Sequence, residues 1–424
     1  MRHTVSTIIG KGVQSVARLR GGGSALPGLV IEKIDPQFVA HTLTNLAHGV
    51  VVISGTNGKT TTTKMVVALL ESQGLRVFTN RTGSNFIRGI AAALLDEIDY
   101  RGRLTADIAV VELDEAHAVH FARQVPPRYS LFLNVMRDQL DRFGEIDHTA
   151  NLLHSVALAT SDTVVINRDD PRLSSAHFLE SLTASVVTYG VSESLLSKFP
   201  SDDSMRDGAT SLPRTTQTSD DVELQSVQGP LITISYDATP HEVNMKLKGV
   251  YNMQNAVGAV ALTRAVMRQS LNEPAMLAAL AKVTPAFGRG EEIIVDGQPC
   301  ELVLVKNPAG FRLSLQSFDS TNYETMIAIN DDYADGRDMS WLWDVDFDSL
   351  TRVSEVGGVR AYDMALRLQY ENVPVDHVDT DLNAALEHFL QTNKGTSKRI
   401  FCTYTAMLAL RKELSHSAVV EKVL

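Results

Sequence analysis

Residues 52–65 read VISGTNGKTTTTKM, an apolar run that breaks at Gly55 and continues into sequence that favours a helix. The pattern predicts a buried strand, a short turn, and a helix that opens with Gly58, Lys59 and Thr60. Backbone N–H groups at the start of a helix lack internal partners, and they attract phosphate oxygens. The stretch therefore predicts a phosphate-binding loop between a strand and a helix.

The residues of this loop have distinct expected roles. Lys59 would bring a positive charge to the β- and γ-phosphates of a nucleotide, and the Thr60 hydroxyl would bind Mg²⁺. Ile53 stands where the usual Walker spacing has a glycine, so the loop is a shorter variant. The other residues expected to contact the nucleotide here are Gly55, Thr56, Asn57, Gly58 and Thr61. A strand-to-helix connection without a ligand is the alternative, which the adjacent Lys and Thr disfavour.

The sequence around the loop alternates between strand and helix patterns. Apolar, β-branched runs are separated by helical or loop sequence, as in the helix pattern of residues 60–74. A strand, a helix and a second strand within about thirty residues form a βαβ unit with parallel strands. The predicted strands are 48–55, 75–80, 106–113, 129–135, 162–167 and 231–237. The predicted fold class is α/β, with a mainly parallel sheet covered by helices.

The chain divides into three predicted parts. RGGGSALPG at residues 20–28 is predicted to be a loop, and TPAFGRGE at 284–291 a hinge. Strand patterns at 301–307 and 323–330 follow that hinge and start a second α/β unit. We expect an N-terminal helix and Gly-rich segment at 1–45, a central nucleotide-binding domain at 46–285 and a smaller Rossmann-like domain at 286–424.

A polar segment interrupts the central part of the chain. Residues from about 193 to 229 are rich in Ser, Thr and Asp and poor in large apolar side chains. Such a composition buries too little apolar surface to offset the entropy of folding. The segment is therefore predicted to be an exposed insertion.

Composition limits the classes of partner. The 424 residues carry 39 Lys and Arg against 50 Asp and Glu, which gives a net charge of −11. An acidic chain without a basic cluster is not expected to bind nucleic acid. No stretch approaches the ~20 apolar residues that span a bilayer, and the N-terminus lacks the apolar core of a signal peptide. We predict a cytoplasmic protein whose contact with the inner face of the membrane is at most peripheral.

Cysteine usage limits the metal chemistry. Cys300 and Cys402 are too few for a disulfide framework or a four-thiolate zinc site. This usage fits a reducing compartment. Any zinc site in this chain would be built from histidines and carboxylates.

Acidic residues follow one of the predicted strands. Glu112, Asp114 and Glu115 lie where that strand ends, and ligands of parallel sheets bind at the carboxyl ends of the strands. Mg²⁺ prefers oxygen ligands, so a carboxylate such as Glu112 could bind the metal directly or through water. A solvated acidic turn is the alternative, strongest for Asp114 and Glu115. Polar side chains also follow two further strands, at 134–141 and 167–170.

Together these motifs resemble those of the Mur ligases, ATP-dependent enzymes that join amino acids to peptidoglycan precursors through an acyl phosphate. The matching stretches, in the family's order over roughly the first 290 residues, are GTNGKTTT at 55–62, Glu112, LNVMRDQLDRFGE at 133–145, NRDDP at 167–171, GVYNMQNAVGAVA at 249–261 and FGRGE at 287–291. The resemblance implies that Asn252, Asn255 and Arg289 contact ATP. The alternatives are N-capping of a helix for both asparagines and a surface salt bridge for Arg289.

Three stretches resemble the amidating, MurT-like branch of the family. RGGGSALPG takes the place of a full UDP-binding domain, KNPAGF lies at 306–311, and NDDYADGRDMSWLWDVDF lies at 330–347. Amino-acid-adding members usually have a ribose-contacting Asp and an Asp-Ser-Tyr-like segment where this chain has Lys306, Asn307 and Pro308. The resemblance implies glutamine-dependent amidation of the D-isoglutamate α-carboxyl in the lipid II stem peptide. ATP would phosphorylate that carboxylate, Lys59 would offset the charge on the transferred phosphate, and a GatD-type glutaminase would supply ammonia.

The resemblance also implies that an aspartate of this chain completes a catalytic triad in the glutaminase. An aspartate can orient a histidine and stabilise its cation in this way. Within DGRDMSWLWD, Asp338 is the first choice, followed by Asp335 and Asp344. Turn or cap positions are the alternative for all three.

One departure from the branch concerns zinc. Many MurT-like proteins have a four-cysteine zinc ribbon in the central domain, and the corresponding stretch here, roughly 190–230, has no cysteine. We therefore expect ATP and Mg²⁺ as cofactors, and no zinc. Two other functions remain open: an amino-acid-adding Mur or folylpolyglutamate-type ligase, and a nucleotide-binding subunit without turnover.

Overall fold

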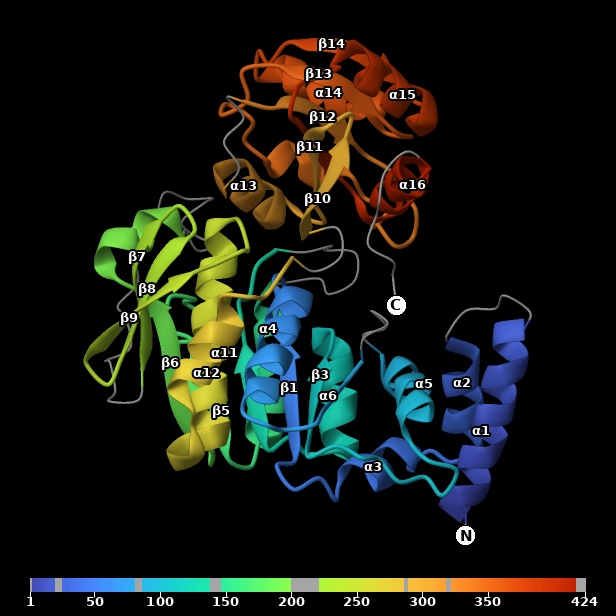
Figure 1. The fold of residues 1–424 in the computed structure, drawn as a ribbon, viewed down its shortest axis with the longest axis vertical. Coiled ribbons are helices and arrows are strands. Elements are labelled where there is room, and N and C mark those ends of the chain that lie inside the picture. The colour runs from blue at the N-terminus through green and yellow to red at the C-terminus, as the bar shows by residue number, and fades with distance from the viewer. Residues whose placement is uncertain are drawn as a thin grey trace.

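A computed structural model describes residues 2–19, 25–80, 86–137, 146–199, 221–285, 289–317 and 322–416. Its strands form two sheets, one built before residue 245 and one built after residue 288 (Figure 1). Both sheets carry helices on their faces, as the sequence predicts for an α/β fold.

The first sheet has nine strands in the order β2-β3-β1-β4-β5-β6-β7-β8-β9. Neighbours from β2 to β7 are parallel, and β7, β8 and β9 form antiparallel hairpins. The strands are β1 (Val50–Ser54), β2 (Val77–Thr79), β3 (Ile108–Glu112), β4 (Tyr129–Phe132), β5 (Thr163–Asn167), β6 (Ser185–Val191), β7 (Val222–Gln228), β8 (Leu231–Tyr236) and β9 (Thr239–Asn244). The six predicted strands of this part of the chain are confirmed.

Helices cover both faces of the first sheet because successive side chains of a strand point to opposite sides. Val51 and Ile53 of β1 pack in a core with α4, α11 and α12, whereas Val50 and Val52 pack in a second core with α3, α5, α6 and α8. The helices of this unit are α3 (Phe38–Leu43), α4 (Lys59–Ser72), α5 (Ile87–Glu97), α6 (Glu115–Gln124), α8 (Ile146–Ala159), α9 (Ala176–Leu179), α11 (Val250–Met267) and α12 (Glu273–Leu280), with 3-10 turns η1 (Glu193–Lys198) and η2 (Arg268–Ser270).

Two N-terminal helices lie at the edge of this unit. α1 (Arg2–Leu19) packs on α2 (Ala25–Ile34) and on α5. The loop predicted at 20–28 is therefore too long, because α2 already begins at Ala25. Pro27 is compatible with this start, since proline is tolerated in the first turn of a helix. Among the helices that the structure describes, none is long and apolar enough to cross a membrane.

The polar insertion predicted from 193 to 229 is also too wide. Both of its ends are ordered, because η1 begins at Glu193 and β7 lies within the segment. Leu195 and Leu224 bury their side chains in the first core, so a few apolar residues suffice to anchor these ends. Residues 200–220 lie outside the described part of the chain.

The second sheet has six strands in the order β10-β11-β15-β12-β13-β14. Only β10 and β11 are antiparallel. One face packs on α13, α14 and η3, and the other on α15 and α16. The elements are β10 (Arg289–Val295), β11 (Gln298–Leu304), α13 (Pro308–Ser317), β12 (Glu324–Ala328), η3 (Ser340–Asp344), β13 (Val353–Gly357), α14 (Ala361–Tyr370), β14 (Val375–Asp379), α15 (Leu382–Thr392), β15 (Lys398–Cys402) and α16 (Tyr404–Leu414).

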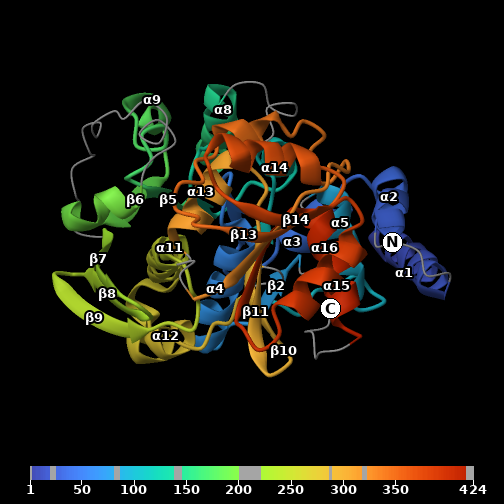
Figure 2. The same ribbon diagram turned by 90° about the horizontal axis from the view of Figure 1, so that it is seen from above.

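The second unit lies over the end of the first at which α4 begins (Figures 1 and 2). Lys248, just before α11, donates to Glu301 of β11 over 2.7 Å and to Glu292 of β10 over 3.0 Å. Tyr251 of α11 packs against the core that the second sheet forms with α13, α14 and η3. These contacts place the second sheet beside the loop that the sequence predicts to bind phosphate.

Candidate active site

The loop Gly55–Gly58 joins the buried strand β1 to α4. Gly58 is the N-cap of α4 and has a φ of 90°, a conformation that other residues rarely adopt. A Cβ atom on Gly58 would lie 2.7 Å from Nδ2 of Asn255, and one on Gly55 would lie 3.0 Å from the backbone of Asn134. Neither position has room for a side chain, so the two glycines set the shape of the loop.

The segment after β4 braces this loop from one side. The N–H of Thr56 donates to the carbonyl of Asn134 over 3.0 Å, and the N–H of Asn57 donates to Asn134 Oδ1 over 2.8 Å. Asn134 Nδ2 donates in return to the carbonyl of Asn57. The N–H of Met136 donates to the Thr56 hydroxyl. The N–H groups that begin a helix have no helical partner by their position, so the start of α4 is the part of this loop expected to bind phosphate.

A second layer of polar residues fixes the bracing segment. Asn167, at the end of β5, donates to the carbonyl of Leu133 over 3.1 Å. Asp170 accepts from the N–H of Val135 over 2.6 Å, and burial raises its pKa to about 6. The polar strand ends noted in the sequence thus contact the backbone beside the loop.

Lys59 turns its ammonium group back over the loop. Its Nζ donates to the carbonyl of Gly55 over 2.6 Å and lies 3.6 Å from Asp114 Oδ1 and 3.7 Å from Glu115 Oε2. The side chain is buried, so the two carboxylates compensate a charge that would otherwise be costly to desolvate. The acidic residues after β3 therefore face this lysine and do not form a solvated turn.

Thr60 and Glu112 meet beside the lysine. The Thr60 hydroxyl donates to Glu112 Oε1 over 2.8 Å. Asn80 fixes Glu112, because its Nδ2 donates to the Glu112 carbonyl and its Oδ1 accepts from the Glu112 N–H. A hydroxyl and a carboxylate are oxygen ligands of the kind that Mg²⁺ prefers, so this pair fits the metal of a bound nucleotide.

Helix α11 carries the two predicted asparagines, and one of them, Asn255, lies against the loop. Asn255 packs on Gly58, as described above. Asn252 Nδ2 donates to the carbonyl of Lys248 over 2.6 Å, while its buried Oδ1 has no hydrogen-bond partner among the described residues. The N-cap residue of α11 is Gly249, and no side chain hydrogen-bonds at that cap. N-capping of α11 is therefore not the role of Asn252 or Asn255. Both remain predicted nucleotide contacts.

The second sheet reaches the loop through Asn307. Its Nδ2 donates to Asn57 Oδ1 over 3.2 Å, and Asn57 Nδ2 lies 3.4 Å from Asn307 Oδ1. Asn307 Oδ1 also accepts from the N–H of Gly310, at the start of α13. In the sequence, Asn307 marks only a difference from amino-acid-adding ligases. In the structure its side chain contacts Asn57 of the phosphate loop.

Thr61 and Arg289 are the two other residues predicted to contact the nucleotide. Thr61 lies in the first turn of α4 with its side chain buried. Arg289 begins β10, and its side chain lies outside the described residues.

The three aspartates proposed for the partner's triad lie in different surroundings. Asp335 is buried and accepts from the N–H of Thr405 over 2.8 Å and from its hydroxyl over 2.5 Å, at the start of α16; burial raises its pKa. Asp338 is exposed, and hydrogen bonds from Ser340 lower its pKa below the ordinary value. Asp344 is also exposed, at the end of η3. A carboxylate at the surface is available to another chain, which favours the exposed Asp338 and Asp344 over the buried Asp335.

Two regions of the chain match known protein families. Residues 53–263 match the Mur ligase middle domain, and residues 304–407 match the MurT ligase C-terminal region. The first region contains the loop, Glu112 and most of α11, and the second contains Asn307 and the three aspartates.

Relatives and solved structures agree with these matches. The chain is 29% identical over 451 aligned residues to the MurT subunit of the glutamine-hydrolysing lipid II isoglutaminyl synthase of Streptococcus pneumoniae, covering 100% of this chain and 99% of that one. A pseudomurein peptide ligase type C from Methanothermus fervidus has a TM-score of 0.68 at 17% identity, over 89% of this chain and 80% of that one. The MurF ligase of Thermotoga maritima in complex with ADP has a TM-score of 0.64 at 16% identity, over 90% and 83%. The two structures show the fold that the chains share.

We expect Gly58→Ala to abolish ATP binding, because the new methyl group would displace Asn255 and distort the start of α4. Gly74→Ala is the matched control, since Gly74 has a φ of 85° but open space around its Cα. Both variants should lose roughly 1–2 kcal/mol of stability from backbone strain. Calorimetric titration with a non-hydrolysable ATP analogue measures the binding. Equal affinity in the two variants would contradict the tight packing described here.

We expect Asn307→Ala to reduce ATP turnover while leaving the affinity for ATP within a few-fold of wild type. The change removes the amide contacts between the loop and the second sheet, each worth about 1 kcal/mol. Asn383→Ala is the control, because that side chain is exposed on α15. Steady-state ADP release with saturating acceptor measures the effect, and wild-type turnover in Asn307→Ala would argue against a role for this contact.

Proposed function

This chain belongs to the Mur ligase family and is an ATP-dependent ligase, and we propose that it is the synthetase subunit of a lipid II isoglutaminyl synthase. In this role it amidates the α-carboxyl of D-isoglutamate in the lipid II stem peptide, which becomes D-isoglutamine. Ammonia comes from glutamine through a GatD-type glutaminase partner. The observation that carries the proposal is a complete phosphate loop in contact, through Asn57 and Asn307, with a region of the MurT type.

The chemistry explains why a nucleotide site is needed. A carboxylate is a poor electrophile, so its oxygen first attacks the terminal phosphorus of ATP, and ADP leaves. Ammonia then attacks the carbon of the acyl phosphate, and inorganic phosphate leaves as the amide forms. Both steps move negative charge through the region in which Lys59 and the first N–H groups of α4 lie.

The residues at the loop divide this work. The Lys59 ammonium group lies over the loop, where it would offset the charge on a transferred phosphate. Asp114 and Glu115 hold that ammonium group in place. Thr60 and Glu112 would bind the magnesium ion that screens the phosphate charge when the nucleotide is bound. Asn255 borders the loop from α11, Asn252 lies one turn earlier on the same helix, and we assign both, with Arg289, to the nucleotide.

An exposed surface of the second unit supports the partner assignment. The ring of Trp343 meets Tyr370 of α14 edge-on, with centroids 5.1 Å apart. Tyr362, Leu366 and Tyr370 recur every four residues, so they lie on one face of α14, and all are exposed. Apolar side chains gathered on a surface are typical of protein-binding sites. Asp338 is exposed and precedes Trp343 by five residues in the sequence, and we propose that a glutaminase bound here contacts its carboxylate.

We expect the purified chain to form amide product from a D-isoglutamate-containing stem peptide, ATP, Mg²⁺ and ammonium chloride without any partner, because ammonium supplies the nucleophile directly. Product is identified by mass spectrometry, and ADP release is measured in parallel. Lys59→Ala should lose both, whereas Lys198→Ala, which removes an exposed lysine of η1, should retain both.

The same assay separates the other functions. Product formation with free amino acids in place of ammonium would indicate an amino-acid-adding ligase and refute amidation. A subunit without catalysis would bind ATP but would not turn it over with any acceptor. In that case cells carrying the Lys59→Ala variant would grow like wild type.

We expect Asp338→Asn to abolish amidation driven by glutamine in the purified pair while leaving amidation driven by ammonium intact. The amide has nearly the same shape but cannot stabilise a histidinium in the partner. Asp344→Asn is the matched control, because that carboxylate is also exposed and lies in the same segment. Unchanged glutamine-driven turnover in Asp338→Asn excludes this residue, and loss in Asp344→Asn alone transfers the role.

A further inference from the structure

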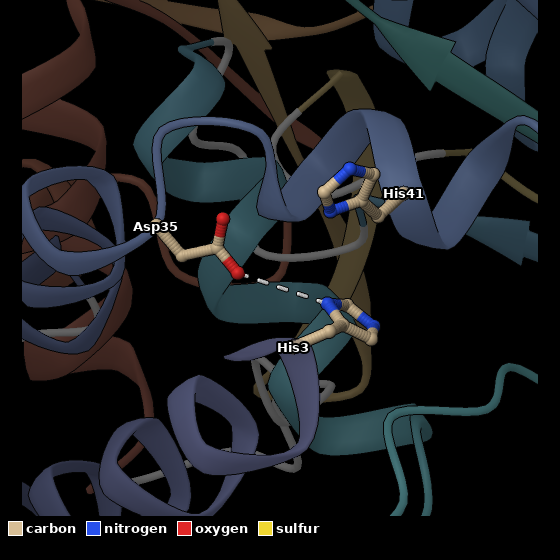
Figure 3. A group of neighbouring side chains, drawn as sticks. All are labelled: His3, Asp35 and His41. Atoms are coloured by element: carbon tan, nitrogen blue, oxygen red, sulfur yellow. Dashed lines mark ion pairs between the residues drawn. The ribbon is translucent and has the colours of Figure 1, made fainter. Parts of the chain in front are cut away.

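Three side chains with metal-binding atoms gather among the N-terminal helices, outside the residues assigned to the nucleotide. His3 lies on α1, Asp35 directly follows α2, and His41 lies on α3 (Figure 3). One nitrogen or oxygen atom from each lies within 4.8 Å of the others. The cluster therefore joins three helices at one point.

The contacts of His3 fix which of its nitrogens carries a proton. Nε2 lies 3.2 Å from the carbonyl oxygen of Gly102, which can only accept a hydrogen bond, so Nε2 is the donor. The ring cannot turn away easily, because it packs on Phe38 with centroids 5.0 Å apart and lies closely over Gly102. In the neutral ring, Nδ1 then presents a lone pair. Histidines that bind metals show this arrangement, with the second nitrogen donating to a carbonyl.

That lone pair faces a buried carboxylate oxygen. His3 Nδ1 and Asp35 Oδ2 are 3.9 Å apart, and neither atom has a hydrogen-bond partner among the described residues. Asp35 is only 3% exposed, so water cannot readily solvate its charge. Two facing acceptors in a buried site require a positive species between them.

The spacing favours a metal ion over a proton as that species. A separation of 3.9 Å is too long for a hydrogen bond, which ends near 3.2 Å for N–H donors. Two ligand atoms bound to one zinc ion at about 2.0–2.1 Å each are separated by roughly 3.3 Å at a tetrahedral angle. The His3 and Asp35 atoms would need to approach by about 0.6 Å, and the other ligand atoms of the cluster, at most 4.8 Å apart, by no more than about 1.5 Å to bind one ion.

The donor set indicates the class of metal. Two imidazoles and one carboxylate suit Zn²⁺ and its first-row neighbours, whereas Mg²⁺ and Ca²⁺ prefer oxygen ligands alone. His41 is exposed, so it provides a path by which an ion can enter, and water can fill the fourth position. We propose that His3, Asp35 and His41 bind a zinc ion that fastens α1 to α2 and α3. This zinc site is built from histidines and a carboxylate and needs no cysteine.

A second cluster with similar residues serves as a control. Glu355 of β13 is buried, and its two oxygens lie 2.8 Å from His377 Nδ1 and 2.7 Å from His388 Nδ1. Both carboxylate oxygens are therefore already hydrogen-bonded, and this cluster is complete without an ion. It has the same donor types as the N-terminal cluster, so it tests whether donor type alone produces binding.

The test is calorimetric titration of Zn²⁺ into the full chain, purified without a polyhistidine tag, stripped with EDTA and kept in excess MgCl₂ to fill oxygen-rich sites. We expect one equivalent to bind in wild type and in His388→Ala. His41→Ala and Asp35→Asn should each weaken binding by at least about tenfold. Titration with Co²⁺ should give the intense visible bands of a four-coordinate ion in wild type and weaker bands in both variants.

Two results would overturn the proposal. The first is no zinc binding in wild type, which would mean that a proton alone lies between His3 and Asp35. The second is binding that His388→Ala weakens and that His41→Ala does not. His41→Ala keeps the test decisive if Asp35→Asn fails to fold, because the His41 side chain is exposed. Neither result depends on the amidation activity, so the two proposals stand or fall separately.

Discussion

The fit of Gly58 under the side chain of Asn255 is the constraint on which the nucleotide site depends. It fixes the first turn of α4 against α11, and it leaves no room for a side chain at the point where the loop becomes a helix. Because α4 starts there, Lys59 points back over the loop and Thr60 points toward Glu112. The buried strands β1, β3 and β4 deliver the loop, the carboxylate and the bracing segment to the same edge of one sheet.

Surrounding polar residues convert this packing into a preorganised site. Asn80 fixes Glu112 through its backbone, and Asn134 fixes the loop through two reciprocal amide contacts. None of these side chains needs to touch a substrate in order to matter, since small displacements of positioned groups reduce rates strongly. The site is thus built from residues at the ends of several strands, and the loop provides only the residues at its centre.

Periodicity and turn chemistry were sufficient to predict the α/β class, six of the nine strands of the first sheet and the turn that joins β1 to α4, because these features are local in the sequence. Local patterns could not predict contacts between distant segments. Asn307 reaches Asn57 across 250 positions of the chain, and His3 meets Asp35 only because α1 folds back on α2. Asn80 could have been identified, since it ends a predicted strand beside Glu112. The polar composition of residues 193–229 predicted an exposed insertion and so missed β7. Two or three apolar side chains of that strand are enough to pack it on the core.

The contacts named here between the two sheets are largely polar. Amide groups join Asn57 to Asn307, and charged groups join Lys248 to Glu292 and Glu301. Contacts of this kind exchange for contacts with water at a cost of about 1 kcal/mol each, whereas separating packed apolar surface costs far more. Separating the two units would exchange these polar contacts for water and uncover the ring of Tyr251, whereas unfolding either unit would uncover a whole hydrophobic core.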